Sequence, residues 1–348
     1  MNFDKVLVIG PNYKRRNGGI SSVLFLYSNV LRENFKFLPS IYFQNIFLST
    51  LLFPINLLCI GAKLCLDRSI NIIHLHGSHQ GSFIRKHIIF LICKYVFRKK
   101  VIYHIHSSHF HKFYNETNQL LRSRISHMVD NSDLVIVLSE EWKLFFTQSF
   151  SPKKICVLEN IVENPNYHEE NVLHGKLKLL FLGRIGERKG IFDLLKVITK
   201  HKLPVEVSIG GDGQILKLKQ IIENNNLTNV NFLGWITGEQ KKEVLKTTNV
   251  FVLPSYDEGL PISILEAMSY KKAIIATKVG GIPRIVKDKI NGFIISPGDS
   301  EELAKAIKNY ILKPELIKLH GENSLNLVQE YYPDSVLKKL NEIYGELV

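Results

Sequence analysis

The sequence lacks the cysteine patterns that mark disulfide-rich or zinc-binding proteins. Its four cysteines form no Cys-x-x-Cys pair and lie within apolar runs. Cysteines of this kind are typical of free thiols in a reducing compartment. The strand-like run KVLVIG starts at residue 5, which leaves no room for a signal peptide before it. We therefore expect a cytoplasmic protein.

Two common nucleotide-binding fingerprints are also missing. The segments VIGPNYKRRNGG and IGGDGQ each follow a predicted strand, but neither fits G-x-G-x-x-G. The P-loop pattern G-x-x-x-x-G-K-[S/T] is absent from the sequence, and so is an Asp-x-Asp pair that could hold a divalent metal against a diphosphate. These absences argue against the dinucleotide-binding and P-loop classes. We expect neither a metal nor another cofactor.

Acidic residues are scarce in the first half of the chain. Residues 1–165 carry 20 Lys and Arg against 10 Asp and Glu, a net charge of +10, whereas residues 166–348 carry 25 against 22, a net charge of +3. A basic surface suits a phosphate-bearing substrate, a membrane surface or nucleic acid, although it also serves solubility alone. Because no nucleic-acid-binding motif is present, nucleic acid is not an expected partner.

Short apolar runs alternate with helix-like stretches along the whole chain, which predicts parallel sheets covered by helices on both faces. The series restarts once, after the polar and aperiodic segment 160–176, which is typical of a linker. The predicted fold class is α/β, with two doubly wound, Rossmann-like domains at residues 1–165 and 166–330. A C-terminal helix within residues 331–348 is expected to cross back to the first domain. The strands predicted in the first series are Val6–Ile9, Ile41–Phe43, Ile72–Leu75, Val101–Ile105, Leu134–Leu138 and Cys156–Leu158.

Two stretches of the first domain are unusually apolar. Residues 46–62 approach membrane-spanning length but contain Pro54 and Asn56, and residues 83–97 are too short to span. We expect buried helices on a parallel sheet, and peripheral contact with an anionic membrane is a second hypothesis. In that second case, five basic side chains would lie near the lipid head groups: Lys86, Lys94, Arg98, Lys99 and Lys100.

Glycine-containing loops follow several predicted strands, at the ends where doubly wound sheets bind ligands. In NGGIS, Gly18 and Gly19 precede a predicted helix, whose N-terminus would favour an anion; a plain turn is an equal alternative. In FLGRIGERKG, Arg184 and Lys189 flank a short loop. A guanidinium fork and an ammonium at a strand end would suit a diphosphate. The alternative is a solvated basic loop.

Histidines alternate at the ends of two predicted strands, in HLHG and in HIHSSHFH. His-x-His places two imidazoles on one face of a strand, which is compatible with a metal site. Without a cysteine or carboxylate at ligand spacing, we expect no metal there. His104 is expected to be a packed strand residue, and His106, which leaves the sheet, is the candidate for contacting a substrate. A hydrogen-bonded loop histidine is the alternative for His106.

The segment DEGLPISILEAMS carries two carboxylates. Glu258 lies in a Gly-Pro turn after a predicted strand, and Glu266 lies about five residues into the helix that follows. Pro261 suits the first turn of that helix, where N–H groups such as those of Leu260 and Ile262 are able to bind oxygens. A partly buried Glu266 needs a partner. Sugar or ribose hydroxyls would serve, and a structural Arg or Lys is the alternative.

At this point the sequence resembles a known family. The Glu-x7-Glu block DEGLPISILEAMS resembles the signature of the family 4 retaining glycosyltransferases of the GT-B fold, the glycosyl transferases group 1. The segments NGGI, HIHSSHF, VLENIV, FLGRIGERKG, GGDG and KVGGIPRIVKDKINGFIISPGD agree with that family in the same order along nearly the whole chain. One departure is Ile161, where the family usually has Gly. The resemblance implies a nucleotide-sugar donor bound mainly by the second domain, in a cleft between the domains.

The resemblance also implies a role for each matching residue. Arg184 and Lys189 would hold the donor diphosphate. Glu258 would bind donor-sugar hydroxyls and Glu266 the ribose, so that the pair would bind the donor rather than attack it. His106 would lie near the sugar or the acceptor hydroxyl. The catalytic candidates are therefore Arg184, Lys189, Glu258 and His106, and the other donor-binding candidates are Gly18, Gly19, Gly183, Gly211, Gly259, Leu260, Pro261, Ile262 and Glu266.

We expect the chain to transfer a hexose-type sugar, with retention and without a metal, to a hydroxyl of a growing, lipid-linked glycan in surface polysaccharide assembly. The leaving phosphate would help to deprotonate the acceptor, and the protein would supply charge stabilisation and positioning. The expected partners are a nucleotide-sugar donor and a glycan or lipid-linked saccharide acceptor, with peripheral contact at the inner face of the cell membrane as a further hypothesis. Two alternatives stay open: a catalytically silent module that binds sugar nucleotide or glycan, and a sugar-nucleotide epimerase of the same fold.

Overall fold

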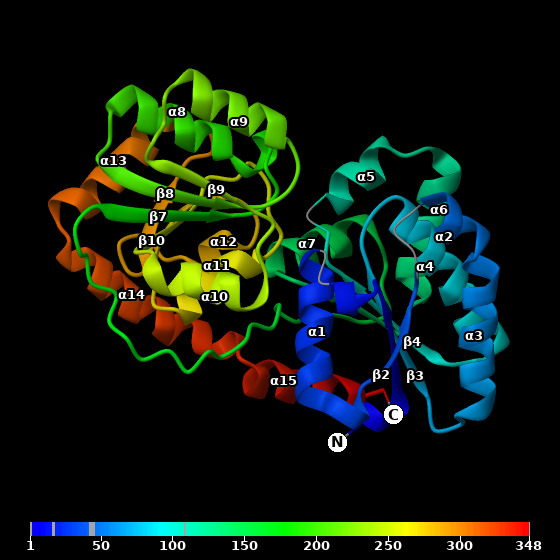
Figure 1. Ribbon diagram of the computed structural model, residues 1–348. Helices are drawn as coiled ribbons and strands as arrows, with labels where there is room; N and C mark the ends of the chain where they lie inside the picture. The colour runs from blue at the N-terminus through cyan, green and yellow to red at the C-terminus, as the bar shows by residue number, and fades with distance from the viewer. Residues whose placement is uncertain (1, 16–17, 42–45, 108, 348) are drawn as a thin grey trace. The chain divides into compact units, whose positions relative to one another are not determined.

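The computed structural model describes residues 2–15, 18–41, 46–107 and 109–347. The chain forms two compact units: unit 1 comprises residues 1–161 and 333–348, and unit 2 comprises residues 162–332. Figure 1 shows that each unit is a sheet with helices packed on its faces. Within the described residues both sheets have six strands, and all neighbouring strands are parallel. The predicted α/β class with two doubly wound sheets is confirmed.

The sheet of unit 1 has the strand order β2-β1-β3-β4-β5-β6. Its strands are β1 (Val6–Gly10), β2 (Lys36–Pro39), β3 (Ile72–Gly77), β4 (Lys100–Ile105), β5 (Leu134–Val137) and β6 (Ile155–Val157). Its helices are α1 (Gly19–Leu31), α2 (Ile46–Leu51), α3 (Phe53–Leu66), α4 (Gly81–Leu91), α5 (Phe110–Glu116), α6 (Gln119–Asn131), α7 (Glu140–Ser149) and α15 (Pro333–Gly345). The chain moves from β1 to one side and then continues on the other, so the strand order reverses between β1 and β3. We call this the switch point of unit 1.

The sheet of unit 2 has the order β12-β11-β10-β7-β8-β9. Its strands are β7 (Leu177–Leu182), β8 (Val205–Gly210), β9 (Val230–Gly234), β10 (Val250–Leu253), β11 (Ala273–Thr277) and β12 (Gly292–Ile295). Its helices are α8 (Ile191–His201), α9 (Ile215–Asn224), α10 (Gly238–Thr247), α11 (Ile262–Ser269), α12 (Ile282–Ile285), α13 (Ser300–Leu312) and α14 (Glu315–Val328). The switch point of unit 2 lies between β7 and β10.

The strands follow from continuous apolar runs. Every residue of β5, β10 and β11 is buried, as expected for strands that are covered on both faces. The helices carry apolar stripes instead. The residues that α8 buries include four at the spacing i, i+3, i+4 and i+7: Ile191, Leu194, Leu195 and Ile198. These two periodicities separate strands from helices in the sequence.

One predicted strand is misplaced. The sequence predicts a strand at Ile41–Phe43, whereas β2 lies at Lys36–Pro39. Ile41 is outside any strand, and residues 42–43 lie outside the described part of the chain. β2 is an edge strand whose four residues are all only partly buried, so its apolar signal is weak.

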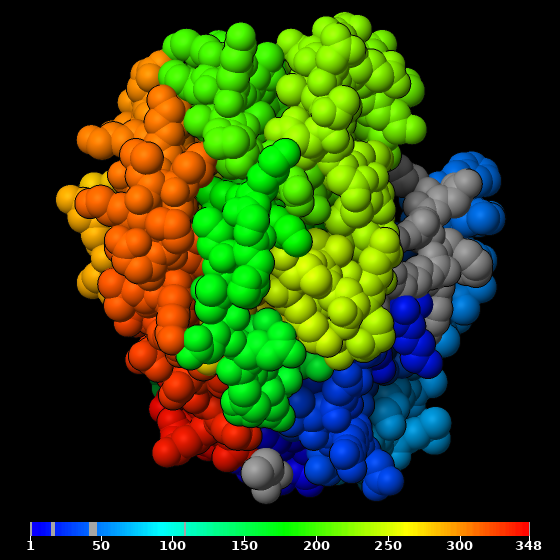
Figure 2. All heavy atoms as spheres, turned by 60° about the vertical axis from the view of Figure 1, so that its left-hand side comes forward, coloured from blue at the N-terminus to red at the C-terminus, as the bar shows by residue number. Residues whose placement is uncertain are grey.

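The polar segment that precedes β7 packs on unit 2. The Nδ2 group of Asn171 donates hydrogen bonds to the carbonyl oxygens of Asn249 and Lys271, at 2.8 and 2.9 Å. Lys318 of α14 pairs with Glu170 at 2.7 Å. Figure 2 shows this extended segment in green, between α14 in orange and α10 in yellow. The segment is therefore fastened to the surface of unit 2 along its length.

The last helix belongs to unit 1. The hydroxyl of Tyr344 in α15 lies 2.6 Å from Nδ1 of His74 in β3, and its ring packs edge-on against Phe3. The side-chain oxygen of Asn341 accepts a hydrogen bond from the N–H group of Asn2 at 2.9 Å. Both ends of the chain thus contribute to the same unit.

The apolar stretch 46–62 forms α2 and most of α3. Pro54 lies in the first turn of α3, where no backbone N–H group is needed. Among the described residues, no helix has both the length and the apolar character to cross a bilayer. One face of α3 nevertheless exposes large apolar side chains, with Ile55 54%, Leu58 73% and Leu66 86% exposed.

Two of the basic residues assigned above to lipid head groups are turned elsewhere. Lys86 is buried and donates a hydrogen bond to the hydroxyl of Ser40. Lys94 pairs with Asp133 at 2.6 Å. The sequence pattern misses both because helical position alone does not show which long side chains reach a neighbouring strand end.

Candidate functional site

Several predicted residues of unit 2 gather at its switch point. The loop after β7 carries Gly183, Arg184 and Lys189, and the loop after β10 carries Glu258. β7 and β10 are neighbours in a parallel sheet, so both loops leave the sheet at the same edge. Ligands of doubly wound sheets bind at this edge, where the strand order reverses.

A buried ion pair joins these two loops. Nζ of Lys189 contacts Oε1 of Glu258, and the same oxygen accepts a hydrogen bond from the hydroxyl of Ser255 at 2.7 Å. The side chains of Lys189 and Glu258 are only 13% and 6% exposed. The lysine predicted for the diphosphate and the glutamate predicted for the sugar are therefore in direct contact.

Glycine allows the two loops to approach this closely. Gly190 has φ +68°, and a Cβ at this position would lie 2.0 Å from the carbonyl oxygen of Pro254. The N–H group of Tyr256 donates to the carbonyl oxygen of Arg188 at 2.8 Å, and Nη1 of Arg188 donates to the carbonyl oxygen of Asp257 at 2.9 Å. The backbone of each loop thus holds the other in place.

Arg184 lies at the surface of the same loop system. Arg184 is exposed, and within the described part of the chain it forms no ion pair with a carboxylate. The loop beneath it is fixed by close backbone packing, because a Cβ on Gly211 would lie 1.8 Å from the carbonyl oxygen of Gly183. The N–H group of Ile185 also donates to the carbonyl oxygen of Asp212 at 2.5 Å. The guanidinium is therefore presented to solvent from a rigid backbone.

Glu266 lies in the middle of α11, which begins at Ile262 after Pro261. Its carboxylate pairs with Lys241 of α10, and the two side chains are 21% and 25% exposed. In the structure a lysine thus occupies the partner position of Glu266. Lys241 cannot be recognised from the sequence as this partner, because it precedes Glu266 by 25 residues and shares no motif with it.

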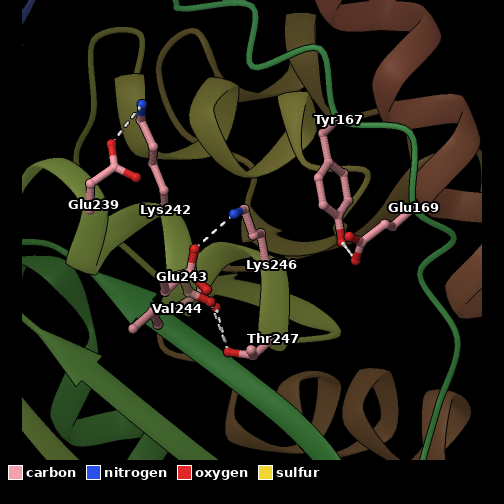
Figure 3. Close-up of polar contacts among 8 residues, drawn as sticks. All are labelled: Tyr167, Glu169, Glu239, Lys242, Glu243, Val244, Lys246 and Thr247. Atoms are coloured by element: carbon pink, nitrogen blue, oxygen red, sulfur yellow. Dashed lines mark hydrogen bonds and ion pairs between the residues drawn. The ribbon is translucent and has the colours of Figure 1, made fainter.

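The neighbours of Lys241 on α10 face other partners. Lys242 pairs with Glu239 at 3.1 Å, and Lys246 pairs with Glu243 at 2.7 Å. Figure 3 shows these pairs along α10, with Tyr167 and Glu169 of the extended segment nearby. Such pairs at spacing i, i+3 are common on exposed helix surfaces. Lys241 is set apart from them because its partner lies on another helix.

The loop after β11 supports the glutamate turn. Gly280 has φ +50°, and a Cβ there would lie 1.8 Å from the carbonyl oxygen of Glu258. The N–H group of Gly281 donates to the carbonyl oxygen of Gly259 at 2.7 Å. Leu260 is buried next to this contact. The paired glycines of the segment KVGGIP are the signal in the sequence for this close approach.

In unit 1, Gly18 and Gly19 lie at the start of α1. Gly18 has φ +86° and precedes the helix, and Gly19 is its first residue. Both are exposed, and a Cβ on Gly18 would meet nothing within 4 Å. Asn17 of the same motif lies outside the described residues. The backbone is therefore open in front of the helix N-terminus.

The histidines of β3 and β4 form two hydrogen-bonded pairs. Nε2 of His74 lies 3.1 Å from Nδ1 of His104. Nδ1 of His76 lies 2.8 Å from Nε2 of His106. Burial lowers the pKa of His106 to about 3, against an opposing effect of its hydrogen bond with Asn160. His106 is therefore a neutral imidazole at neutral pH, able to donate or accept one hydrogen bond at each ring nitrogen but not to act as a cation.

One group of side chains in the described residues could offer ligands to a metal: His74, His76 and His104, with ring nitrogens within 4.8 Å of one another. The group is buried and contains no carboxylate or thiolate. Burial lowers the pKa of His76 well below its usual value, and nearby charges, including that of Lys86, lower it further. A dication would enter this site without an anionic ligand to offset its desolvation. The geometry thus suits an array of neutral imidazoles.

Solved structures resemble the whole chain in fold. Sucrose-phosphate synthase from Thermosynechococcus elongatus matches with a TM-score of 0.83 at 17% identity, covering 98% of both chains. Anabaena HepE in complex with UDP-glucose matches with a TM-score of 0.80 at 18% identity, covering 98% of this chain and 99% of the other. At such identities the likeness shows the fold alone. The chain has the GT-B fold of glycosyltransferases.

Sequence comparison then names the family. The model of the family described as glycosyl transferases group 1 matches residues 163–326, nearly all of unit 2. An uncharacterised glycosyltransferase of Methanocaldococcus jannaschii is 26% identical over 287 residues, 74% of this chain and 71% of the relative. The O-antigen chain mannosyltransferase C of Escherichia coli is 25% identical over 247 residues, 68% of this chain and 65% of the relative. The chain thus spans about two thirds of these relatives, and its residues 163–326 match the glycosyl transferases group 1.

Proposed function

We propose that the chain transfers a hexose-type sugar from a nucleotide-diphosphate donor to a hydroxyl of a growing, lipid-linked glycan, with retention of the anomeric configuration and without a metal. The observation that carries this proposal is the Lys189–Glu258 contact at the switch point of unit 2, beside the exposed Arg184. It brings a diphosphate-binding cation and a hydroxyl-binding carboxylate together on one rigid pair of loops.

Donor binding changes partners within this pair. The donor diphosphate offers Lys189 and Arg184 new negative oxygens, and charge-assisted hydrogen bonds of this kind are strong. Glu258 then accepts hydrogen bonds from donor-sugar hydroxyls, with the backbone at Gly259 and Leu260 beside it. In the same way Glu266 exchanges Lys241 in part for the ribose hydroxyls. The ion pairs therefore keep both carboxylates oriented before the donor arrives.

The transfer step needs no nucleophile from the protein. The acceptor oxygen attacks the anomeric carbon on the face from which the diphosphate leaves. The bond from the anomeric carbon to the phosphate oxygen breaks, the new glycosidic bond forms, and the acceptor proton passes to the leaving phosphate. Arg184 and Lys189 stabilise the charge that develops on the leaving group. His106, neutral at neutral pH, contributes a hydrogen bond near the sugar or the acceptor hydroxyl.

The proposed metal independence is supported by the same arrangement. Two side-chain cations already serve the diphosphate, so a divalent ion has no separate charge to neutralise. Turnover in the presence of excess EDTA, equal to turnover without it, is the expected result. A rate that falls with EDTA and returns with added Mg²⁺ would contradict this part of the proposal.

The proposed acceptor is supported by a surface of unit 1 and by the name of a relative. The E. coli relative named above acts in O-antigen chains, by its name, and the exposed apolar face of α3 suits peripheral contact with a bilayer. We expect co-sedimentation with vesicles of phosphatidylglycerol at low salt, reduced by Leu58→Glu. Leu144→Glu is a matched control, because Leu144 is also exposed, at 58%, but lies on α7. Equal binding of both variants would contradict a contact through α3.

The reaction itself is tested in two stages. Thermal shift with UDP-, GDP- and ADP-sugars identifies the donor, and release of the nucleoside diphosphate then measures turnover. Proton NMR of the product reports the anomeric configuration. Arg184→Met should abolish turnover at unchanged stability, whereas Lys200→Met, at another exposed cation of unit 2, should leave turnover intact. Donor binding without release of the nucleoside diphosphate, whichever acceptor is added, would indicate a catalytically silent binding module. Release of an altered sugar nucleotide would indicate an epimerase.

A further inference from the structure

Lys86 is a buried cation that the proposed reaction does not use. The residue lies on α4 and is 1% exposed. Its Nζ donates to the hydroxyl of Ser40 at 2.6 Å, which is a neutral acceptor, although an ammonium has three N–H donors. Across the described residues, Lys86 forms no ion pair with a carboxylate. Burial, with a smaller effect of the charge of Arg85, lowers its pKa to about 7. When protonated, the ammonium therefore has no counter-charge among the described residues.

This ammonium lies next to the switch point of unit 1. Ser40 directly follows β2, and both its N–H group and its hydroxyl donate to the carbonyl oxygen of Gly10 at the end of β1, at 2.7 and 3.0 Å. His76, near the end of β3, is close enough for Lys86 to lower its pKa, although burial is the main cause of that shift. Lys86 thus reaches the carboxyl edge of the sheet at the ends of β2 and β1, next to the switch point, where doubly wound sheets bind ligands.

A second cation, Arg85, accompanies it. Arg85 is half-buried, and its Nη1 lies 3.5 Å from the place of a Cβ on Gly81, the first residue of α4. The guanidinium is therefore folded back toward the start of the helix, at the same edge of the sheet. Its buried Nε has no hydrogen-bond partner among the residues described. A guanidinium fork beside an ammonium matches a doubly charged phosphate group better than a single carboxylate.

We propose that Arg85 and Lys86 bind a phosphate of the acceptor, and that this acceptor is a lipid-linked diphosphate. The inference rests on the proposed function in one respect, namely that unit 1 takes the acceptor. It gives a reason for the buried lysine. A buried ion without a partner destabilises a fold, and an apolar residue of similar size is often more stable in its place. Groups that lower stability in this way are typical of binding sites.

Stability of the unliganded chain is the first test. Lys86→Met keeps the length of the side chain and removes its charge, while the hydroxyl of Ser40 keeps its bond to Gly10. The melting temperature should stay the same or rise. Arg68→Gln is the matched control, because Arg68 is exposed and precedes β3 at the opposite edge of the same sheet. A melting temperature that falls in Lys86→Met with unchanged ligand binding would assign Lys86 a structural role and overturn the proposal.

Calorimetry with three probes is the second test: farnesyl diphosphate, inorganic pyrophosphate and farnesol. All titrations use the full chain carrying Arg184→Met, so that the diphosphate loop of unit 2 does not compete. Lys86→Met and Arg85→Gln should each weaken farnesyl diphosphate binding by about 10- to 100-fold, the usual loss for a charged hydrogen bond, and Arg68→Gln should not.

The probes separate the sources of the phosphate. If farnesyl diphosphate binds more tightly than pyrophosphate, and both bind through Lys86, the result supports a lipid diphosphate. If pyrophosphate binds as tightly as farnesyl diphosphate, the phosphate site is supported, but its assignment to a lipid is overturned. Farnesol bound as tightly as its diphosphate, independently of Lys86, overturns the proposal. Binding is measured without turnover, so it is independent of the transfer reaction. If the parent chain, with Arg184 in place, transferred no sugar, that result would contradict the proposed function, and Lys86-dependent binding would still support this site.

Discussion

Removing the lysine of the Lys189–Glu258 pair should destabilise unit 2 strongly. Lys189→Met leaves a carboxylate that is 6% exposed with the hydroxyl of Ser255 as its remaining partner. Breaking a buried pair from one side costs about 3–5 kcal/mol. The lower end applies here, because Ser255 still donates to the carboxylate and the lysine side chain was 13% exposed. Unit 2 spans residues 162–332, and for a unit of this size about 3 kcal/mol lowers the melting temperature by roughly 6–12 °C.

Removing both charges should restore most of that stability. The double variant Lys189→Met/Glu258→Gln buries no charge and keeps a hydrogen bond from Ser255, so we expect it within about 1 kcal/mol of the parent chain. Arg184→Met is the matched control for loss of a cation from the same loop. Because Arg184 is exposed, its removal should change stability by less than about 0.5 kcal/mol.

The chain offers a convenient assay for unit 2. It has two tryptophans, Trp142 in unit 1 and Trp235 in unit 2. In a Trp142→Phe background, tryptophan fluorescence therefore reports the unfolding of unit 2 alone. A shift in Lys189→Met no larger than that in Arg184→Met would refute the reasoning, and so would a double variant as unstable as Lys189→Met.

Three further predictions concern single features. Gly175→Ala should lower the free energy of unfolding by about 1 kcal/mol, because φ is +76° but a Cβ would contact nothing. Gly280→Ala should lower it by at least about 2 kcal/mol more, since its Cβ would lie 1.8 Å from a backbone oxygen. Equal melting temperatures of the two variants would contradict this. In chemical denaturation, Tyr344→Phe should lower the free energy of unfolding by about 1–3 kcal/mol, because it leaves a buried ring nitrogen of His74 unpaired. Tyr95→Phe is the control and should lower it by less than about 0.5 kcal/mol, because Tyr95 is 50% exposed. Burial, with a smaller effect of a neighbouring histidine, lowers the pKa of His74 to about 3, against about 6.5 when unfolded. Between these two pKa values only the unfolded chain protonates the imidazole of His74. The free energy of unfolding should therefore fall by about 1.4 kcal/mol for each unit by which the pH drops. An equal melting temperature at pH 7 and pH 5 would contradict this prediction.

The arrangement of strands and loops was accessible from sequence for physical reasons. Fully buried parallel strands read as continuous apolar runs, so β10 and β11 could be predicted, whereas the half-buried edge strand β2 could not. Arg184, Lys189 and Glu258 could be placed in loops after strands. Because neighbouring parallel strands end at one edge, the fold brings those loops together.

The pairing of charges was not accessible in the same way. Nothing in the spacing of residues indicates that Lys241 contacts Glu266, since the two lie on different helices. Lys86 appeared to be one of several basic surface residues, and only the position of Ser40 at the end of β2 shows that it points inward. Side-chain partners across elements depend on three-dimensional packing, which local patterns do not encode.

The contribution of α15 to unit 1 has a consequence for how the chain acquires its structure during synthesis. Unit 2 is continuous in sequence, so it can fold as soon as residue 332 has left the ribosome. Unit 1 stays incomplete until residues 333–348 follow, and until then Nδ1 of His74 lacks the hydroxyl of Tyr344. Unit 1 can therefore complete its folding only after the whole of unit 2 has been synthesised. This reverses the usual order in which N-terminal domains fold earlier.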